Sequence, residues 1–226
     1  MKKIYTGKTK DVCELADGNY KLIFKDDMTG EGGEFDPGAN TVGLTVDGAG
    51  AAGLKMSVYY FKLLEKKGFS THYISSEKNE MTVKPCTVFG KGLEVICRYV
   101  ATGSYIRRYG DYIEDGAVLD AVVEMTIKND ERGDPLINED SLAALGILKP
   151  SEHSELKTTM KNICAIVKSD MEDKGLELLD IKLEFGTDKS GKLTLIDEIS
   201  GGNMRTTKNG KTLHPLELAK IVSNIK

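Results

Sequence analysis

Apolar and polar residues alternate along much of the N-terminal half of the chain, a pattern typical of half-buried β-strands. KKIYTG, DVCEL and YKLIF follow one another within residues 2–25, with a turn expected at residues 17–19. THYIS, MTVKP and LEVICRYVA are also expected to be strands. A helix is expected at residues 54–67, with Gly68 as its C-terminal cap. The pattern predicts a small antiparallel β lobe with one covering helix.

Glycine is concentrated between the third of these strands and the helix. Residues 30–53 contain eight glycines. Such a density predicts mobile or tightly turning loops and no regular element.

From residue 103 onward the pattern becomes mixed. GSYIRRYGD is expected to form a short helix, and VVEMTIKND a strand. Apolar residues recur at three- and four-residue steps in residues 151–174, which predicts a long helix capped by Ser151 and ended by Gly175. A final amphipathic helix is expected from Pro215. The elements predict an α+β protein.

We expect two lobes, a small β-rich lobe over residues 1–90 and a larger α/β lobe over residues 91–226. The net charge of −4 argues against bulk binding of nucleic acid, which favours a basic surface. The sequence contains no run of 18 apolar residues, so no membrane-spanning helix is expected. The first ten residues lack the apolar core of a signal peptide, so a cytoplasmic protein is expected. The four cysteines form no CxxC pair, and any metal is expected to be magnesium held by carboxylates and phosphates.

LLDIKLEFGTDKSGKLTLIDEIS, residues 178–200, is predicted to be a hairpin. A turn centred on residues 189–190 would set Lys182 opposite Asp197, with Glu184 on the diagonal of the same face, about 7–8 Å away. One interpretation is a solvated ladder of charges. The other is a site where two carboxylates share a hard cation beside an ammonium group. The Leu/Ile-rich strands, typical of buried strands, favour the second interpretation.

Two further tracts carry groups that can bind phosphate. In YTGKTK, Lys8 and Lys10 follow a glycine turn, which either cradles phosphates or is an ordinary hairpin turn with surface lysines. In CRYVATGSYIRRYG, Arg98 ends a strand and Ser104 begins a helix, so an anion is expected there unless this is only a capped helix. His72 in STHYIS is either catalytic or a structural histidine at a strand end.

Seven tracts together resemble the SAICAR synthetase family, the phosphoribosylaminoimidazole-succinocarboxamide synthases of purine biosynthesis. They occur in family order over about the first 200 residues: YTGKTK, FKDDMTG, STHYIS, ICRYVATGSYIRRYG, GDPLINED, LLDIKLEFG and LIDEIS. The resemblance implies a fold related to the ATP-binding lobes of protein kinases. It also implies an ATP-dependent ligase that joins L-aspartate to the carboxylate of the carboxyaminoimidazole ribonucleotide CAIR, giving SAICAR, ADP and phosphate. Homodimers or other homo-oligomers are usual in this family.

The resemblance also implies roles for individual residues. Residues 88–93 correspond to the segment that contacts adenine. Lys182 and Asp197 correspond to catalytic positions. The remaining roles are binding of ATP by Lys8, Lys10, Glu184 and Asp197, of Mg²⁺ by Glu184 and Asp197, and of the ribonucleotide by Arg98, Ser104, Lys182 and Arg205.

The chain departs from the family pattern at residues 30–53 and at residues 201–214, where GGNMRTTKNGKTLHP replaces the usual PDTxRxWD. Both regions border the substrate pocket in the family, so these departures bear on the specificity for the amino acid and for the ribonucleotide. Two alternatives remain, an ATP-dependent small-molecule kinase and a non-catalytic nucleotide-binding paralogue. The absence of HRD and DFG tracts argues against a protein kinase.

Overall fold

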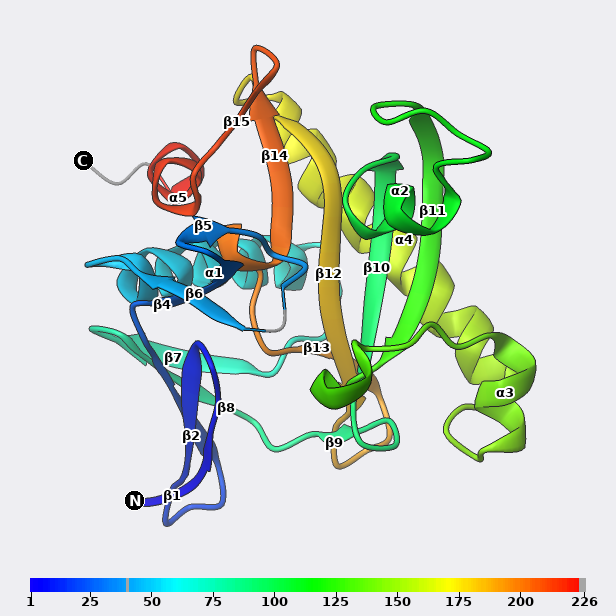
Figure 1. The fold of residues 1–226 in the computed structure, drawn as a ribbon. Coiled ribbons are helices and arrows are strands. Elements are labelled where there is room, and N and C mark those ends of the chain that lie inside the picture. The colour runs from blue at the N-terminus through cyan, green and yellow to red at the C-terminus, as the bar shows by residue number, and fades with distance from the viewer. Residues whose placement is uncertain (40, 224–226) are drawn as a thin grey trace. The chain divides into compact units, whose positions relative to one another are not determined.

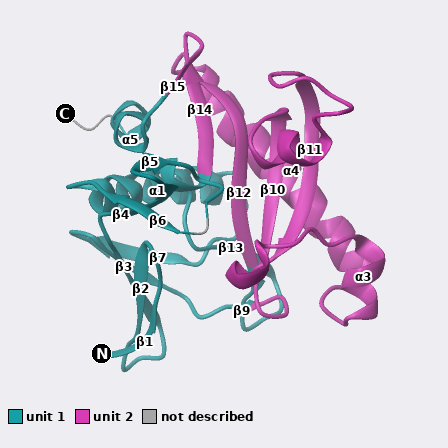
Figure 2. Cartoon of the chain, in the orientation of Figure 1, with its two compact units in different colours: residues 1–87, 186–203, 213–226 teal, residues 88–185, 204–212 magenta. Residues whose placement is uncertain are grey.

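The computed structural model describes residues 1–39 and 41–223, and the chain divides into two compact units (Figures 1 and 2). The first unit comprises residues 1–87, 186–203 and 213–226, and the second comprises residues 88–185 and 204–212. The expected division into residues 1–90 and 91–226 differs from this grouping by leaving residues 186–203 and 213–226 out of the first lobe and by including residues 88–90 in it.

Hydrogen bonds explain why those C-terminal segments group with the first unit. Strand β13 (Leu193–Ile196) is hydrogen-bonded to the segment that directly precedes β7. Leu195 N donates to Ser70 O and His72 N donates to Leu195 O, both at 3.0 Å. Helix α5 (Pro215–Ser223) packs against helix α1 (Ala49–Lys66). These contacts join segments far apart in sequence, which periodicity alone does not reveal.

The first unit contains a five-stranded antiparallel sheet in the order β1-β2-β3-β8-β7. Its strands are β1 (Lys2–Thr6), β2 (Lys10–Glu14), β3 (Tyr20–Phe24), β7 (Tyr73–Glu77) and β8 (Glu80–Val83). The strands match the alternating segments, and Gly18 has φ 81° in the predicted turn. Helix α1 covers the sheet with Tyr60, Phe61 and Leu64 fully buried, and Gly68 follows its end at φ 91°.

The glycine-rich region is regular, contrary to the expectation of loops. It forms the three-stranded sheet β5-β4-β6, with β4 (Asp27–Glu31), β5 (Glu34–Phe35) and β6 (Val42–Thr45). A Cβ on Gly43 would lie 2.4 Å from the carbonyl carbon of Gly30, so glycine permits these strands to approach closely. Helix α1 likewise begins at Ala49, five residues before the predicted start at Leu54. Gly30, Gly43 and Gly50 therefore mark close backbone packing, whereas Gly32, Gly33 and Gly48 adopt positive φ with open space around them.

The second unit is built on the antiparallel strands β11-β10-β12-β14-β15, hydrogen-bonded in that order. Helix α4 (Pro150–Glu172) packs on β10 and β11 and covers one face of the sheet (Figure 1). The strands are β10 (Leu93–Val100), β11 (Val118–Ile127), β12 (Glu177–Thr187), β14 (Met204–Lys208) and β15 (Lys211–Thr212). The shorter elements of this unit are α2 (Ser104–Tyr109), α3 (Glu139–Ala144) and the 3₁₀ turn η1 (Asp130–Arg132), while β9 (Thr87–Val88) lies at the junction of the two units in sequence and the 3₁₀ turn η2 (Gly201–Asn203) belongs to the first.

The long helix α4 begins differently from the prediction. Pro150 occupies its first turn, where the missing N–H costs nothing, and Lys149 is the N-cap residue in place of Ser151. The Lys149 backbone N–H donates to Glu152 Oε2 at 2.7 Å. Its C-terminal end agrees with the prediction, since Gly175 follows it at φ 70°. No helix in residues 1–39 and 41–223 has the length and apolarity needed to cross a membrane.

Candidate functional site

Lys10 lies at the centre of a buried charge cluster in the first unit. Its Nζ lies 3.2 Å from Asp197 Oδ2 and donates a hydrogen bond to Glu198 Oε1, and only 10% of its side chain is exposed. Its ammonium group also faces the Phe24 ring, 5.4 Å from the centroid. Burial lowers the pKa of Lys10, but Asp197 and Glu198 more than offset it and raise the pKa above its ordinary value. Lys10 is therefore a permanent cation held between two carboxylates.

Lys8 lies in the turn that leads into β2. Gly7 N donates to Lys10 O at 2.8 Å, and a Cβ on Gly7 would lie 2.6 Å from that same oxygen. Lys25, which directly follows β3, stabilises the turn because its Nζ donates to Gly7 O at 2.9 Å. The turn is thus tight and requires glycine, and Lys8 lies within it.

Asp197 has a left-handed backbone, with φ 64°. A non-glycine residue in that region is strained and persists only where surrounding structure holds it. The ring of His72 supplies one restraint, since its Nε2 lies 3.2 Å from Asp197 O. Ser57 supplies another further along the segment, because its Oγ donates to Gly53 O at 2.8 Å and accepts from Ile199 N at 3.3 Å.

Asn203 restrains the same segment from its C-terminal side. Its Nδ2 donates to Glu198 O at 2.8 Å, and its Oδ1 accepts from Ser200 N at 3.0 Å. Together with the contacts of His72 and Ser57, these bonds tie residues 197–200 to the body of the first unit. The carboxylates of Asp197 and Glu198 are therefore preorganised around Lys10.

Arg98 lies at the centre of the charge cluster in the second unit, with 1% of its surface exposed. Its Nε donates to Glu124 Oε2 at 2.7 Å and its Nη1 donates to Asp180 Oδ2 at 2.9 Å. Its Nη2 donates to Ser104 Oγ at 2.9 Å. Because the Ser104 oxygen accepts from Arg98, its hydroxyl hydrogen is available to donate to another group.

Arg205 enters this cluster from β14. Its Nη1 donates to Asp180 Oδ2 at 2.8 Å, the same oxygen that accepts from Arg98. The Arg205 guanidinium lies against Gly103, where a Cβ would be 2.8 Å from Cζ. Gly103 adopts φ 55°, ψ −126°, a conformation that side chains other than glycine disfavour. Glycine is needed here both for the backbone and for the arginine.

Arg108 adds a third guanidinium group, whose Nη2 donates to Glu124 Oε2 at 2.7 Å. Three guanidinium groups and two carboxylates leave a formal surplus of one positive charge in this cluster. Such a surplus beside a donor hydroxyl favours an anion that accepts several hydrogen bonds, such as a phosphate.

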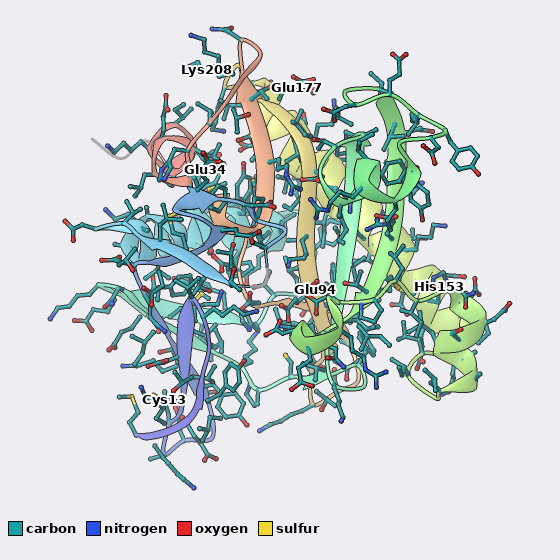
Figure 3. All side chains as sticks on the ribbon, in the orientation of Figure 1. Cys13, Glu34, Glu94, His153, Glu177 and Lys208 are labelled. Carbon is teal, nitrogen blue, oxygen red and sulfur yellow. The ribbon has the colours of Figure 1, made fainter. Side chains whose placement is uncertain are left out.

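Lys182 and Glu184 lie on the same face of β12, as the sequence predicts. Each forms an ion pair with a different residue. Lys182 Nζ lies 2.8 Å from Glu94 Oε1, and Thr126 Oγ1 donates to Glu94 Oε2 at 3.0 Å (Glu94 is labelled in Figure 3). Glu184 Oε1 accepts from Lys128 Nζ at 2.7 Å. The hairpin turn itself is where it was predicted, with Gly191 N donating to Asp188 O at 2.9 Å.

The structure thus gathers the predicted residues into separate groups. Lys10 and Asp197 meet in the first unit, whereas Arg98, Ser104 and Arg205 meet in the second. The predicted adenine segment, residues 88–93, runs from the end of β9 into β10, with Gly92 N donating to Phe89 O at 2.9 Å.

Five side chains that complete these groups were not selected from the sequence: Glu94, Glu124, Asp180, Glu198 and Asn203. For two of them, the sequence contained a pattern that could have identified them. Asp180 alternates with Lys182 and Glu184 in DIKLEFG, so its side chain belongs to the same strand face. Glu198 directly follows Asp197. Glu94 and Glu124 required knowledge of which strands pair with β10.

The comparisons with known proteins agree over nearly the whole chain. The SAICAR synthetase family profile matches residues 3–217. The phosphoribosylaminoimidazole-succinocarboxamide synthase of Clostridium tetani (strain Massachusetts / E88) is 56% identical over 225 residues, which cover 98% of this chain and 99% of the relative. A solved SAICAR synthetase (Type-2) in complex with ADP superposes with a TM-score of 0.87 at 30% identity, over 98% of both chains. The synthase of Ehrlichia chaffeensis gives 0.85 at 29% identity, over 98% of this chain and 94% of that one.

The architecture is therefore the α+β fold of synthetases of this kind, and the fold class expected from the sequence is confirmed. The chain belongs to the SAICAR synthetase family. The resemblance of its ordered motifs, including DIKLEFG and DEIS, is confirmed at the level of the family.

Proposed function

We propose that the chain is the ATP-dependent ligase that joins L-aspartate to the carboxylate of CAIR, giving SAICAR, ADP and phosphate in purine biosynthesis. The observation that carries this function is the 56% identity, over nearly full length, to a relative named phosphoribosylaminoimidazole-succinocarboxamide synthase. The solved relative in complex with ADP supports a nucleotide substrate. The cluster around Arg98 has a surplus positive charge suited to an anionic substrate, and the carboxylates around Lys10 suit a nucleotide that brings a metal cation.

The chemistry requires activation of a carboxylate, which is a poor acyl donor because its leaving group would be oxide. Transfer of the γ-phosphoryl group of ATP to a CAIR carboxylate oxygen releases ADP and forms an acyl phosphate. The aspartate amine then attacks the acyl carbon, phosphate leaves, and the amine proton passes to a substrate oxygen or to water. The enzyme mainly needs to position three charged substrates and to stabilise phosphoryl charge.

The first unit supplies groups for the nucleotide. Lys10, held as a cation by Asp197 and Glu198, faces the β- and γ-phosphates, and Lys8 contacts them from the glycine turn. The family resemblance assigns contact with the adenine ring to residues 88–93, which belong to the second unit. Since Lys10 is held in place before the substrate binds, it stabilises transferred charge without reorganising.

Asp197 in the first unit and Glu184 in the second are each suited by their own chemistry to bind Mg²⁺. Both are carboxylates, which suit this hard cation, and 31% and 18% of their side chains remain exposed to a ligand. No three Asp, Glu, His or Cys side chains gather into a metal cage in the described part of the chain. A single carboxylate of this kind fits Mg²⁺, which takes much of its coordination from substrate phosphates and water. When bound, the metal neutralises phosphate charge during transfer.

The second unit supplies groups for the ribonucleotide. Arg205 and the Ser104 hydroxyl donate to its phosphate, and Arg98 adds its charge while orienting the serine oxygen. Lys182, held near Glu94, orients the CAIR carboxylate and screens it from ATP. Lys182 and Asp197 are the proposed catalytic residues because they touch the reacting groups.

We also propose that the protein works in the cytoplasm as a homodimer or another homo-oligomer. This part of the proposal rests on the usual behaviour of the family. Light scattering coupled to size exclusion would measure the subunit number, and a monomer at working concentration would contradict the proposal.

The test is release of ADP by purified protein given Mg-ATP, CAIR and L-aspartate, with reactions that omit each substrate. Release that needs all three, with SAICAR identified by mass, supports the ligase. Release without aspartate would instead indicate a kinase or an uncoupled ATPase. Binding of ATP without any turnover would indicate a nucleotide-binding paralogue.

A further inference from the structure

His72 is buried in the first unit, with 4% of its surface exposed. Its Nε2 lies 3.2 Å from the backbone oxygen of Asp197. A carbonyl oxygen only accepts hydrogen bonds, so Nε2 carries the proton and donates it. Burial lowers the pKa of His72 to about 4, which agrees with a neutral ring.

The backbone of His72 is anchored on both sides. His72 N donates to Leu195 O at 3.0 Å, and Lys84 N donates to His72 O at 2.7 Å. Its ring meets the ring of Phe61 edge-on, with centroids 5.5 Å apart and planes at 80°, and Phe61 is fully buried. These backbone and ring contacts place the imidazole with Nε2 towards the carbonyl of Asp197.

The contact falls on the strained residue of the segment. Asp197 has φ 64°, and its carbonyl direction depends on the same backbone conformation that directs its carboxylate towards Lys10. A hydrogen bond to that carbonyl favours the strained conformation over relaxed ones. An apolar residue could fill the space beside Phe61, but it would leave this carbonyl without the donor.

We propose that His72 is a positioning residue for Asp197, holding its carboxylate in place for the metal–nucleotide complex through a hydrogen bond to its backbone. The inference rests on the proposed function for the role of Asp197. His72 touches no substrate in this proposal and transfers no proton. It acts only through the conformation of Asp197.

The test compares His72→Phe, which keeps an aromatic ring but has no donor, with His72→Gln, whose amide N–H can reach the same carbonyl. His153→Phe is the control, because His153 lies on α4 in the second unit and its partner is Glu139. The first readout is binding of Mn²⁺ in the presence of ADP, followed by electron paramagnetic resonance. The second is the separation of kcat from KM for CAIR in the full reaction.

We expect His72→Phe to weaken Mn²⁺ binding and lower kcat by about tenfold, the effect of losing one hydrogen bond at the site. KM for CAIR should stay unchanged, and His72→Gln should recover most of both losses. His72→Asn, whose donor is too short to reach, should behave like His72→Phe and replaces it if that variant does not fold. His153→Phe should match the wild type in both readouts.

Wild-type metal binding and kcat in folded His72→Phe or His72→Asn would overturn the inference. A loss of thermal stability or of active fraction with unchanged Mn²⁺ affinity would also overturn it, because the histidine would then be structural only. Failure of the ligase reaction in the wild type is a separate result. In that case a weakened Mn²⁺–ADP complex in His72→Phe would still support positioning of Asp197, while the ligase proposal would fall.

Discussion

Lys10 Nζ and Asp197 Oδ2 lie 3.2 Å apart, although one residue begins the second strand of the chain and the other follows the last strand of the hairpin. The pair is mostly shielded from water and includes Glu198 as a second carboxylate. Breaking such a pair by removing one partner is costly, since it leaves uncompensated buried charge. The arrangement therefore predicts strong effects of substitutions at either end.

Lys10→Met is expected to lower kcat about a hundredfold and to raise KM for ATP, because the preorganised cation is lost. Steady-state kinetics measure both. Lys3→Met is the matched control, since Lys3 also pairs with an aspartate, Asp11 at 2.5 Å, but is 53% exposed on the sheet edge. Equal effects of the two substitutions would contradict a special role for Lys10.

Asp197→Asn is expected to weaken binding of Mn²⁺ in the presence of ADP by at least about tenfold, because a charged ligand becomes neutral. Electron paramagnetic resonance titration measures the affinity. Asp115→Asn, in an exposed loop of the second unit, should leave it unchanged. Normal Mg-ATP binding and wild-type turnover in Asp197→Asn would show that the metal assignment is wrong.

Gly103→Ala is expected to displace the Arg205 guanidinium and to raise KM for CAIR by roughly tenfold or more, because a small misplacement of a binding group is costly. KM for ATP should change little. Gly116→Ala separates this contact from backbone strain, since Gly116 also has a positive φ, 86°, but its Cβ would meet nothing within 4 Å. If Gly116→Ala raised KM for CAIR equally, the contact with Arg205 would not be the cause.

Arg98→Ala is expected to reduce stability to unfolding by about 1.5–3 kcal/mol, because Asp180 and Glu124 would each lose a charged hydrogen bond but keep Arg205 and Arg108 as partners. Urea denaturation measures this loss. The apparent KM for CAIR should rise far more than that for ATP, and an equal rise in both would argue against a ribonucleotide role. Arg132→Ala, at an exposed arginine in η1, is the control for both measurements.

Local patterns predicted most elements correctly because they depend on neighbours in the sequence. Alternation placed the strands of the first sheet, and Gly68 and Gly175 marked helix ends through positive φ. The same reasoning failed at residues 30–53, where glycine permits close strand packing as well as loops. A glycine count cannot separate those two uses, because the difference lies in how near another backbone comes.

The sequence by itself determined the α+β class, the family and most of the residues proposed for binding, since ordered motifs and periodicity are properties of the chain. Only the tertiary structure decided which charges are partners. Asp180 joins Arg98 and Arg205 because β12 lies between β10 and β14, and His72 reaches Asp197 because β13 bonds to the chain before β7. Periodicity tells which face of a strand is buried, whereas strand order and burial decide what that face meets.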